Sequence, residues 1–132
     1  MIDYQMVVGG EASGPLLVLD EPLSFWGGVD PQTGWVIDVN HPQVGMSLAG
    51  QIVAMPHGRG SSSASAVLAE TMAKGTAPAG FVLNEIDPIL MVGSLVGRHL
   101  YGVSCPILVG PTPSRSGRMH RIREGRLIEE IE

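Results

Sequence analysis

Short apolar runs separated by turns fill the first part of the chain. Leu16–Leu19 lies between a Gly-Pro pair and a Glu-Pro pair, which is typical of a buried strand. Trp35–Ile37 is predicted as another strand, reached through a turn at Asp30–Gly34 in which proline fixes φ and glycine supplies the left-handed position. His41–Gly45 is predicted as a further turn or loop. This part of the chain is therefore expected to be rich in strands and turns.

The period of the apolar positions changes after Pro56. Before it, Gln51–Met55 is a strand-type run. After it, apolar positions recur at spacings of three and four, which predicts one buried helix face made of Ala64, Val67, Leu68, Thr71 and Met72. Glu70 and Lys74 form an i,i+4 pair in the favourable order, and Gly75 is expected to end the helix in the left-handed conformation.

The remainder alternates strands with one more helix. The expected elements are a strand at Phe81–Leu83, a helix from Pro88 to about His99, a strand at Pro106–Val109, and a hairpin over Met119–Ile131 that turns near Glu124-Gly125. Asp87 and Pro88 suit the cap and the first position of that helix. The order predicts an α/β domain with two main helices and a mixed sheet or a small barrel.

Length and composition favour one folded domain. The chain has 132 residues, of which 44% are hydrophobic and 16% charged, which excludes wholesale disorder. We predict a single domain over residues 1–132, with a core at about 9–110 and a hairpin-like tail at 111–132. The apolar stretch Pro88–Gly97 is shorter than the ~20 residues of a membrane-spanning helix, so it is predicted to be a buried helix. The first residues lack a basic region and a long apolar region, so a secretory signal is not expected and a cytoplasmic location is.

The charge distribution bears on partners. A net charge of -5 argues against a nucleic-acid binder, because neutralising phosphates requires clustered Lys and Arg. The tail contrasts with the rest of the chain, because arginines at 115, 118, 121, 123 and 126 face four glutamates there. A solvated hairpin or a strand pair that contacts a partner is expected.

The segment Gly58–Ser63 is the best candidate for chemistry. A strand, a glycine turn and serines at the start of a helix bring unpaired backbone N–H groups and the positive end of the helix dipole to one place. Gly58 and Gly60 allow a ligand close to the backbone, and Arg59 adds a positive charge. Such a site suits a carboxylate or a phosphate, and it would stabilise a serine alkoxide acting as a base. The alternative is that Ser61 or Ser62 only caps the helix.

Other motifs are excluded or weaker. The dinucleotide, Gly-Lys-Ser/Thr and Gly-x-Ser-x-Gly patterns are absent. The histidines at 41, 57, 99 and 120 lack metal-ligand spacing, so ordinary structural roles and no metal site are predicted. The single cysteine, Cys105, excludes an internal disulfide and a thiolate metal site, and is expected in the core or a loop. Phe25–Asp30 is either a buried anchor or a patch that faces a partner.

Three motifs resemble those of a known family. Asp20–Gly34 resembles the N-terminal signature of the aconitase X small subunit, or swivel domain. Pro56–Ser63 is similar to the active-site turn of that family, and Gly75–Ala79 to the segment after its helix. The resemblance covers about residues 9–110 and implies the swivelling β/β/α fold of the aconitase superfamily.

The resemblance also implies an activity. The small chain would pair with a large subunit that holds an iron–sulfur cluster and most substrate contacts, and together they would dehydrate cis-3-hydroxy-L-proline or, in archaea, mevalonate 5-phosphate. Ser61 would be the base that removes a proton beside a carboxylate, and Arg59, Gly60 and Ser62 would contact the substrate. Aconitase has an arginine after the two serines, whereas Ser63 stands here. This difference moves the clamping of the carboxylate to Arg59 or to the partner.

Two functions of other classes compete with the dehydratase. One is a phosphohistidine carrier, a swivelling domain that needs its histidine just after a glycine-threonine turn, whereas His57 precedes the turn. The other is a non-catalytic module for anion binding or assembly. Within the dehydratase class, cis-3-hydroxy-L-proline is the preferred substrate.

Overall fold

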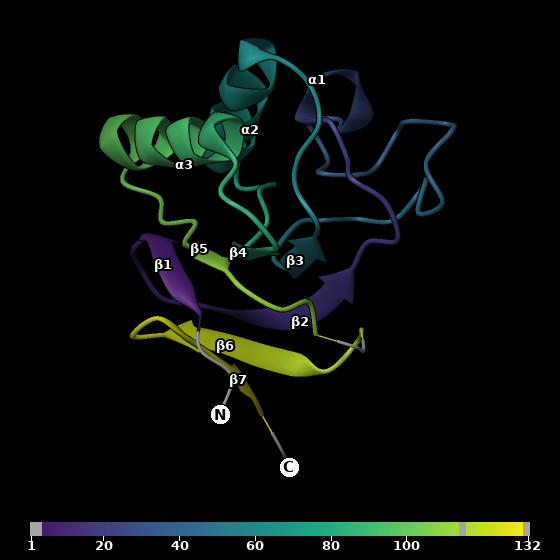
Figure 1. Ribbon diagram of the computed structural model, residues 1–132. Coiled ribbons are helices and arrows are strands. Elements are labelled where there is room, and N and C mark those ends of the chain that lie inside the picture. The colour runs from purple at the N-terminus through teal and green to yellow at the C-terminus, as the bar shows by residue number, and fades with distance from the viewer. Residues whose placement is uncertain (1–3, 114–115, 131–132) are drawn as a thin grey trace.

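The chain folds into one mixed sheet with its helices on one side (Figure 1). The computed structural model describes residues 4–113 and 116–130. The seven strands lie in the order β1-β5-β4-β3-β2-β6-β7. Their bounds are β1 Gln5–Val8, β2 Ala12–Val18, β3 Ile52–Met55, β4 Gly80–Leu83, β5 Ile107–Val109, β6 Met119–Arg123 and β7 Arg126–Glu129. The helices are the short α1 at Phe25–Gly28, α2 at Ser62–Lys74 and α3 at Pro88–Tyr101.

The centre of the sheet is parallel and follows chain order. β2 pairs with β3, β3 with β4, and β4 with β5, each in parallel. Each connection crosses through a helix above the sheet, so the carboxyl ends of these strands meet at one edge (Figure 1). All residues of β3 and β4 are buried, as expected for parallel strands covered on both faces.

The sheet curls around a second, smaller core. The main core lies between the sheet and the helices, where the rings of Phe25 and Phe81 meet edge to face with centroids 5.8 Å apart. On the other face, Ile122 of β6 reaches across β2 and β3, because a Cβ added to Gly80 of β4 would lie 2.9 Å from its Cδ1. The expected α/β fold with a mixed sheet and two main helices is confirmed, as a curled half-barrel with the additional short α1.

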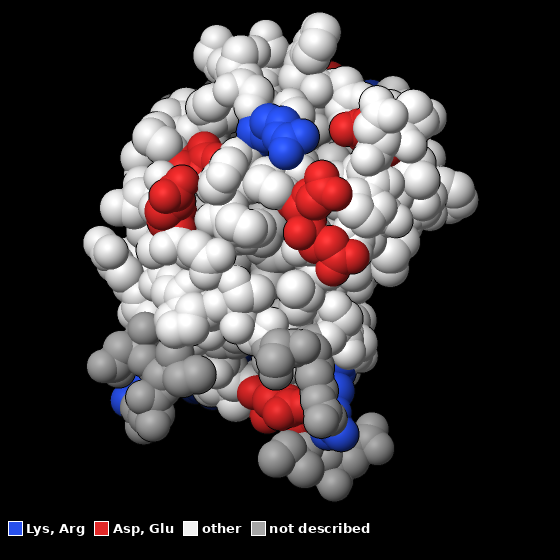
Figure 2. All heavy atoms as spheres, turned by 45° about the vertical axis from the view of Figure 1, so that its right-hand side comes forward, with Lys and Arg blue, Asp and Glu red and all other residues white. Residues whose placement is uncertain are grey.

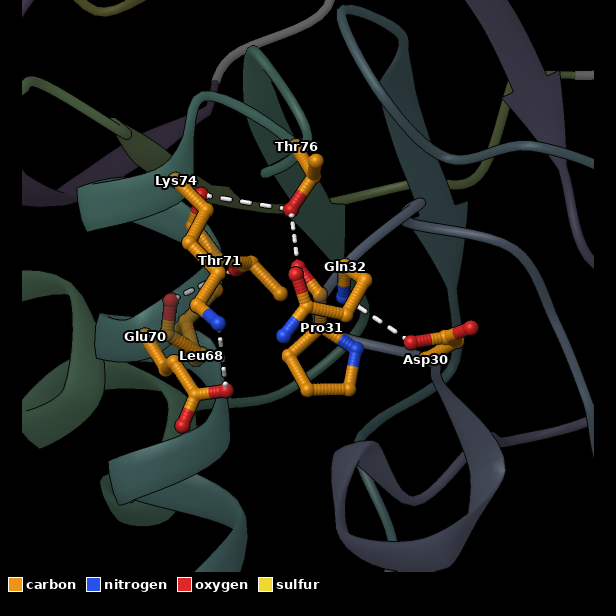
Figure 3. Close-up of polar contacts among 8 residues, drawn as sticks. All are labelled: Asp30, Pro31, Gln32, Leu68, Glu70, Thr71, Lys74 and Thr76. Carbon is orange, nitrogen blue, oxygen red and sulfur yellow. Dashed lines mark hydrogen bonds and ion pairs between the residues drawn. The ribbon is translucent and has the colours of Figure 1, made fainter.

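Most predicted elements are present. The strands expected near Leu16–Leu19, Gln51–Met55, Phe81–Leu83 and Pro106–Val109 are β2, β3, β4 and β5, and the two expected helices are α2 and α3. Gly75 ends α2 with φ 73°, and Lys74 Nζ lies 3.7 Å from Glu70 Oε2. Just beyond this end, Thr76 Oγ1 donates to the carbonyl of Pro31 at 2.7 Å, which ties the helix to the turn at Asp30–Gly34 (Figure 3).

The strand predicted at Trp35–Ile37 is wrong. Only isolated bridges occur there, between Val29 and Val36 and between Trp35 and Ser47. Tight turns on both sides of the segment leave room for single pairings rather than a ladder. The run is apolar because Val36 points into the core, not because it belongs to the sheet. The pattern also gave no specific prediction of β1.

The prediction that Pro88–Gly97 is a buried helix is correct for one side of the helix and wrong for the other. One side of α3 is buried through Leu90, Gly93, Ser94 and Gly97. Its outer side exposes Val92, Leu95 and Val96 by 47%, 45% and 39%. An uninterrupted apolar run hides the helical period, so the sequence could not indicate which side lies outward. Within the described ranges, no helix combines the length and the hydropathy needed to cross a membrane.

The expected hairpin in the tail is β6 with β7. It turns at Glu124-Gly125, and β6 also pairs with β2. Three arginines of the tail lie beside carboxylates on the surface, with Arg118 3.3 Å from Glu129, Arg121 2.8 Å from Glu130 and Arg123 3.7 Å from Glu11. These solvated pairs agree with the solvated-hairpin interpretation, whereas contact with a partner stays a prediction. Arg115 and Ile131 lie outside the described residues.

Candidate functional site

The turn between β3 and α2 lies where the carboxyl ends of three parallel strands meet. The loop after β2 reaches it through Leu23, which bridges to Gly58 and accepts a hydrogen bond from the Arg59 N–H at 3.3 Å. The loop after β4 reaches it through Asn84, whose N–H donates to the Pro56 carbonyl at 2.9 Å. Open α/β sheets bind ligands at this edge. The position agrees with a functional site.

Both glycines of the turn are required by the structure itself. Gly60 has φ 118°, and a Cβ there would lie 2.6 Å from Ser24 Oγ. A Cβ on Gly58 would lie 2.6 Å from Asp87 Oδ2 and 3.1 Å from Leu90 Cδ1. The sequence interpretation gave these glycines to ligand access, whereas the structure first requires them for close packing of three loops.

Ser61 occupies the cap position of α2 without acting as a side-chain cap. Its backbone is extended, with φ -112° and ψ -177°, and its hydroxyl accepts no cap hydrogen bond. The Ser61 carbonyl accepts from the Ala64 N–H at 2.9 Å, so the first turn of the helix is formed by the backbone alone. Capping therefore does not account for this serine, and its exposed hydroxyl is free to contact a ligand.

Arg59, Gly60 and Ser62 are exposed next to Ser61. None of the ion pairs found among residues 4–113 and 116–130 includes Arg59. Its charge adds to that of the unpaired N–H groups at the start of a helix. The four predicted site residues therefore lie together on one exposed rim that suits an anionic group.

The other candidates have structural partners. His41 is buried, contacts the Glu21 carbonyl through Nε2 at 3.0 Å, and accepts from the Gln43 N–H through Nδ1. His57 Nδ1 lies 2.5 Å from the Gly58 carbonyl oxygen, and the buried His120 Nδ1 lies 2.9 Å from the carbonyl oxygen of Arg118. His99 is exposed on α3.

Cys105 is a core residue, as expected. Burial raises the pKa of its thiol to about 12, so the thiolate needed for metal binding does not form at neutral pH. Throughout the described part of the chain, no three His, Cys, Asp or Glu side chains are grouped so that they could hold a metal ion. This chain offers no ligand set for a metal or a cluster there.

Phe25 and Trp26 differ in burial, so only Phe25 matches the interpretation as a buried anchor. Phe25 is buried in the main core, whereas Trp26 is 63% exposed. Further large apolar side chains are exposed along the same loop, and together we call them the loop surface: Trp26, Trp35, Ile37, Val39, Val44 and Met46. It begins beside the site, because Ser24, which contacts Gly60, donates from Oγ to the Trp26 carbonyl at 3.0 Å. Figure 2 shows a face on which charged clusters are few and separated by uncharged surface.

Sequence reasoning missed the second contact of Asp87. It predicted only the cap of α3, which is confirmed, because Asp87 Oδ1 accepts from the N–H groups of Ile89 and Leu90 at 2.9 and 3.2 Å. The other oxygen, Oδ2, accepts from the Gly58 N–H at 2.7 Å. The signal was that both residues follow neighbouring parallel strands, whose carboxyl ends meet at one edge.

Comparisons with known proteins identify a family that this chain matches over nearly its whole length. A family profile described as "Aconitase X swivel domain" matches residues 1–129. The cis-3-hydroxy-L-proline dehydratase of Pseudomonas aeruginosa is 50% identical over 107 residues, which are 81% of this chain and 18% of that protein. The phosphomevalonate dehydratase small subunit of Methanopyrus kandleri is 50% identical over 82 residues, which are 62% of this chain and 61% of that protein. The chain thus spans less than two thirds of either relative.

A solved structure agrees across the whole chain. The crystal structure of Thermococcus kodakaraensis aconitase X in its holo-form has a TM-score of 0.87 and 30% identity, with 98% of both chains covered. The profile match extends beyond the residues 9–110 that carry the sequence resemblance, and so includes most of the tail.

Proposed function

The chain belongs to the aconitase X swivel-domain family, and on that premise we propose that it is the small subunit of a dehydratase for a small hydroxy carboxylic acid. It acts as a single swivel domain and needs a large subunit. The observation that carries this proposal is the turn Gly58–Ser62, which presents a serine hydroxyl that no helix cap uses. Both curated relatives described above are dehydratases by name.

Ser61 is the base in this proposal. Its alkoxide oxygen takes a proton from the carbon beside the substrate carboxylate, the C–H electron pair forms the double bond, and the hydroxyl on the neighbouring carbon leaves as hydroxide. Return of the proton from the Ser61 hydroxyl, directly or through solvent, converts the hydroxide to water and restores the base. The unpaired N–H groups and dipole at the start of α2 stabilise the alkoxide. Arg59 and Ser62 hold the substrate carboxylate or the alkoxide, and Gly60 keeps the backbone open to the substrate.

Departure of the hydroxyl needs a Lewis acid, and the described residues of this chain offer no ligands for an iron–sulfur cluster that could serve as one. A cluster requires several cysteine thiolates, whereas Cys105 is the single cysteine and its thiol is buried and protonated. We assign an iron–sulfur cluster to the large subunit, where it polarises the leaving oxygen when bound. Family membership supports this assignment.

The loop surface is our candidate for the contact with the large subunit. It carries six exposed large apolar side chains, of which Trp26 is linked to the turn through Ser24. Exposed large apolar side chains concentrated in one loop are typical of protein interfaces. In the Pseudomonas relative the matching region is 18% of a much longer chain, so there the domain has a large covalent neighbour. Docking through the loop surface would bring Ser61 to a substrate held mainly by that partner.

We favour cis-3-hydroxy-L-proline as the substrate, with mevalonate 5-phosphate as the alternative. Relatives named for either substrate match this chain at up to 50% identity, over 107 residues for the first substrate and over 82 to 126 residues for the second, so these matches do not separate the two substrates. The preference rests on the form of the turn at Pro56–Ser65, which resembles that of bacterial members of the family more than that of archaeal ones.

Reconstitution tests the proposal. The chain, its large subunit and their mixture are assayed with each substrate, and product is followed by chromatography. We expect turnover only from the mixture, and of cis-3-hydroxy-L-proline. Turnover by the small chain alone would contradict the division of labour, turnover of mevalonate 5-phosphate alone would select the alternative substrate, and an active large subunit without this chain would leave Ser61 with no catalytic role.

A further inference from the structure

A single carboxylate, that of Asp87, joins the active turn to the neighbouring helix. Oδ1 accepts from the first N–H groups of α3, and Oδ2 accepts from the Gly58 N–H at 2.7 Å. Hydrogen bonds to an ionised oxygen are stronger than neutral ones. The two oxygens of this carboxylate therefore hold the start of α3 to Gly58, which lies 29 residues before Asp87 in the sequence.

The bond to Gly58 is the contact by which a side chain from another loop holds this turn, beside the bridge between Leu23 and Gly58 and two backbone hydrogen bonds. Those contacts, at Pro56 and Arg59, have lengths of 2.9 and 3.3 Å, against 2.7 Å for the bond to Gly58. Gly58 precedes Ser61 by three residues, and the carboxylate approaches it so closely that a Cβ there would lie 2.6 Å from Oδ2. The position of the turn therefore depends on this carboxylate.

The double contact explains why the residue is an aspartate. Serine, threonine and asparagine are also good helix caps, but each side chain presents one acceptor atom. Capping α3 and holding Gly58 needs two acceptor oxygens that point in different directions, and a short carboxylate supplies them. A cap alone would not require this residue type.

We propose that Asp87 is a positioning residue for the dehydration, which fixes the turn so that the Ser61 hydroxyl meets the substrate proton at the required distance. Its effect on catalysis rests on the function proposed above, whereas its hold on Gly58 does not. Because the same turn carries Arg59 and Ser62, which contact the substrate in that function, loss of the bond lowers kcat and also raises KM, with the larger effect on kcat. Misplacement of a reacting group by about 1 Å can cost about 100-fold in rate.

Asp87→Asn separates the two contacts. Asparagine keeps one acceptor oxygen, which two N–H groups of α3 compete for, and turns an NH₂ donor toward the Gly58 N–H. In the reconstituted enzyme we expect kcat to fall by about 10- to 100-fold, with a smaller rise in KM. In the full chain alone, the Gly58 amide should exchange with solvent about tenfold faster by NMR, and the melting temperature should fall less than in Asp87→Ala, because the cap of α3 is kept while the Gly58 N–H loses its acceptor. Asp87→Ser, which also keeps only the cap, should behave alike.

A matched control is Ser65→Ala. Ser65 Oγ donates to the Ile89 carbonyl at 2.6 Å, so it links α2 to α3 without contacting the turn. This variant should lower stability but change neither kcat nor the exchange of Gly58. An unchanged kcat in Asp87→Asn, or an unchanged Gly58 exchange, would overturn the proposal. The exchange measurement needs neither substrate nor partner, so its result stands even if the dehydratase assignment fails.

Discussion

The starts of α2 and α3 look alike in sequence and differ in use. The two helices run side by side in the same direction, since Ser65 contacts Ile89 and positions further along α2 pack on positions further along α3. Both begin after a parallel strand with a favourable cap residue, Ser61 or Asp87. Asp87 has its oxygens occupied by the fold, whereas the Ser61 hydroxyl makes no cap bond. A cap residue can thus stabilise a helix or be left free for chemistry.

The largest expected effect that tests this comparison is the loss of turnover in Ser61→Ala. We expect kcat of the reconstituted enzyme to fall by about 10²- to 10⁴-fold, which is the usual contribution of a general base. The free energy of unfolding should change by less than about 0.5 kcal/mol, because no side-chain cap bond is lost. Activity assays, co-purification with the large subunit and urea denaturation measure the three quantities. Near-normal turnover would favour the non-catalytic module instead.

Asp87→Ala, unlike Ser61→Ala, should clearly lower the free energy of unfolding. It removes both the cap of α3 and the bond to Gly58, so the free energy of unfolding should fall by about 2 kcal/mol. Urea denaturation of the chain alone, measured beside Ser61→Ala, gives the comparison directly. Equal stability of the two variants would mean that the starts of the two helices do not differ as described.

The smallest effect concerns the other end of α2. Thr76→Val removes the hydroxyl that donates to the Pro31 carbonyl at 2.7 Å and keeps the shape of the side chain (Figure 3). The free energy of unfolding should fall by about 1 kcal/mol, with kcat unchanged, because the active turn lies at the start of the helix. A large loss of kcat in this variant would show that catalysis depends on the whole helix rather than on its first turn.

The sequence predicted the elements where the period of the side chains was clear. α2 was found from its recurring apolar face, its end from Gly75, and the central strands from short apolar runs bounded by turns. The predictions failed where they rested on apolar composition alone, without a period in the positions of the apolar side chains. Trp35–Ile37 is apolar without joining a ladder, and the outer side of α3 is apolar without being buried.

The sequence proposed the residues of the candidate site but not the contacts that hold them in place. Local sequence placed Arg59, Gly60, Ser61 and Ser62 together, because they are consecutive. It could not show that the hydroxyl of Ser61 is free of the cap, since serine at this position usually uses it. Nor could it reveal the contact between Asp87 and Gly58, which exists only once two parallel strands lie side by side.

The assembly of the turn from three loops has a consequence for folding. Leu23, Gly58 and Asp87 follow β2, β3 and β4, so their contacts form only after those strands have paired. Pairing β2 with β3 must close the long loop of residues 19–51, and such non-local contacts slow folding. A chain that has formed only its helices would carry the serine and the arginine without the geometry that makes them reactive. If the turn acts as proposed, its arrangement therefore appears late, with the completed sheet, and a partly folded chain lacks it.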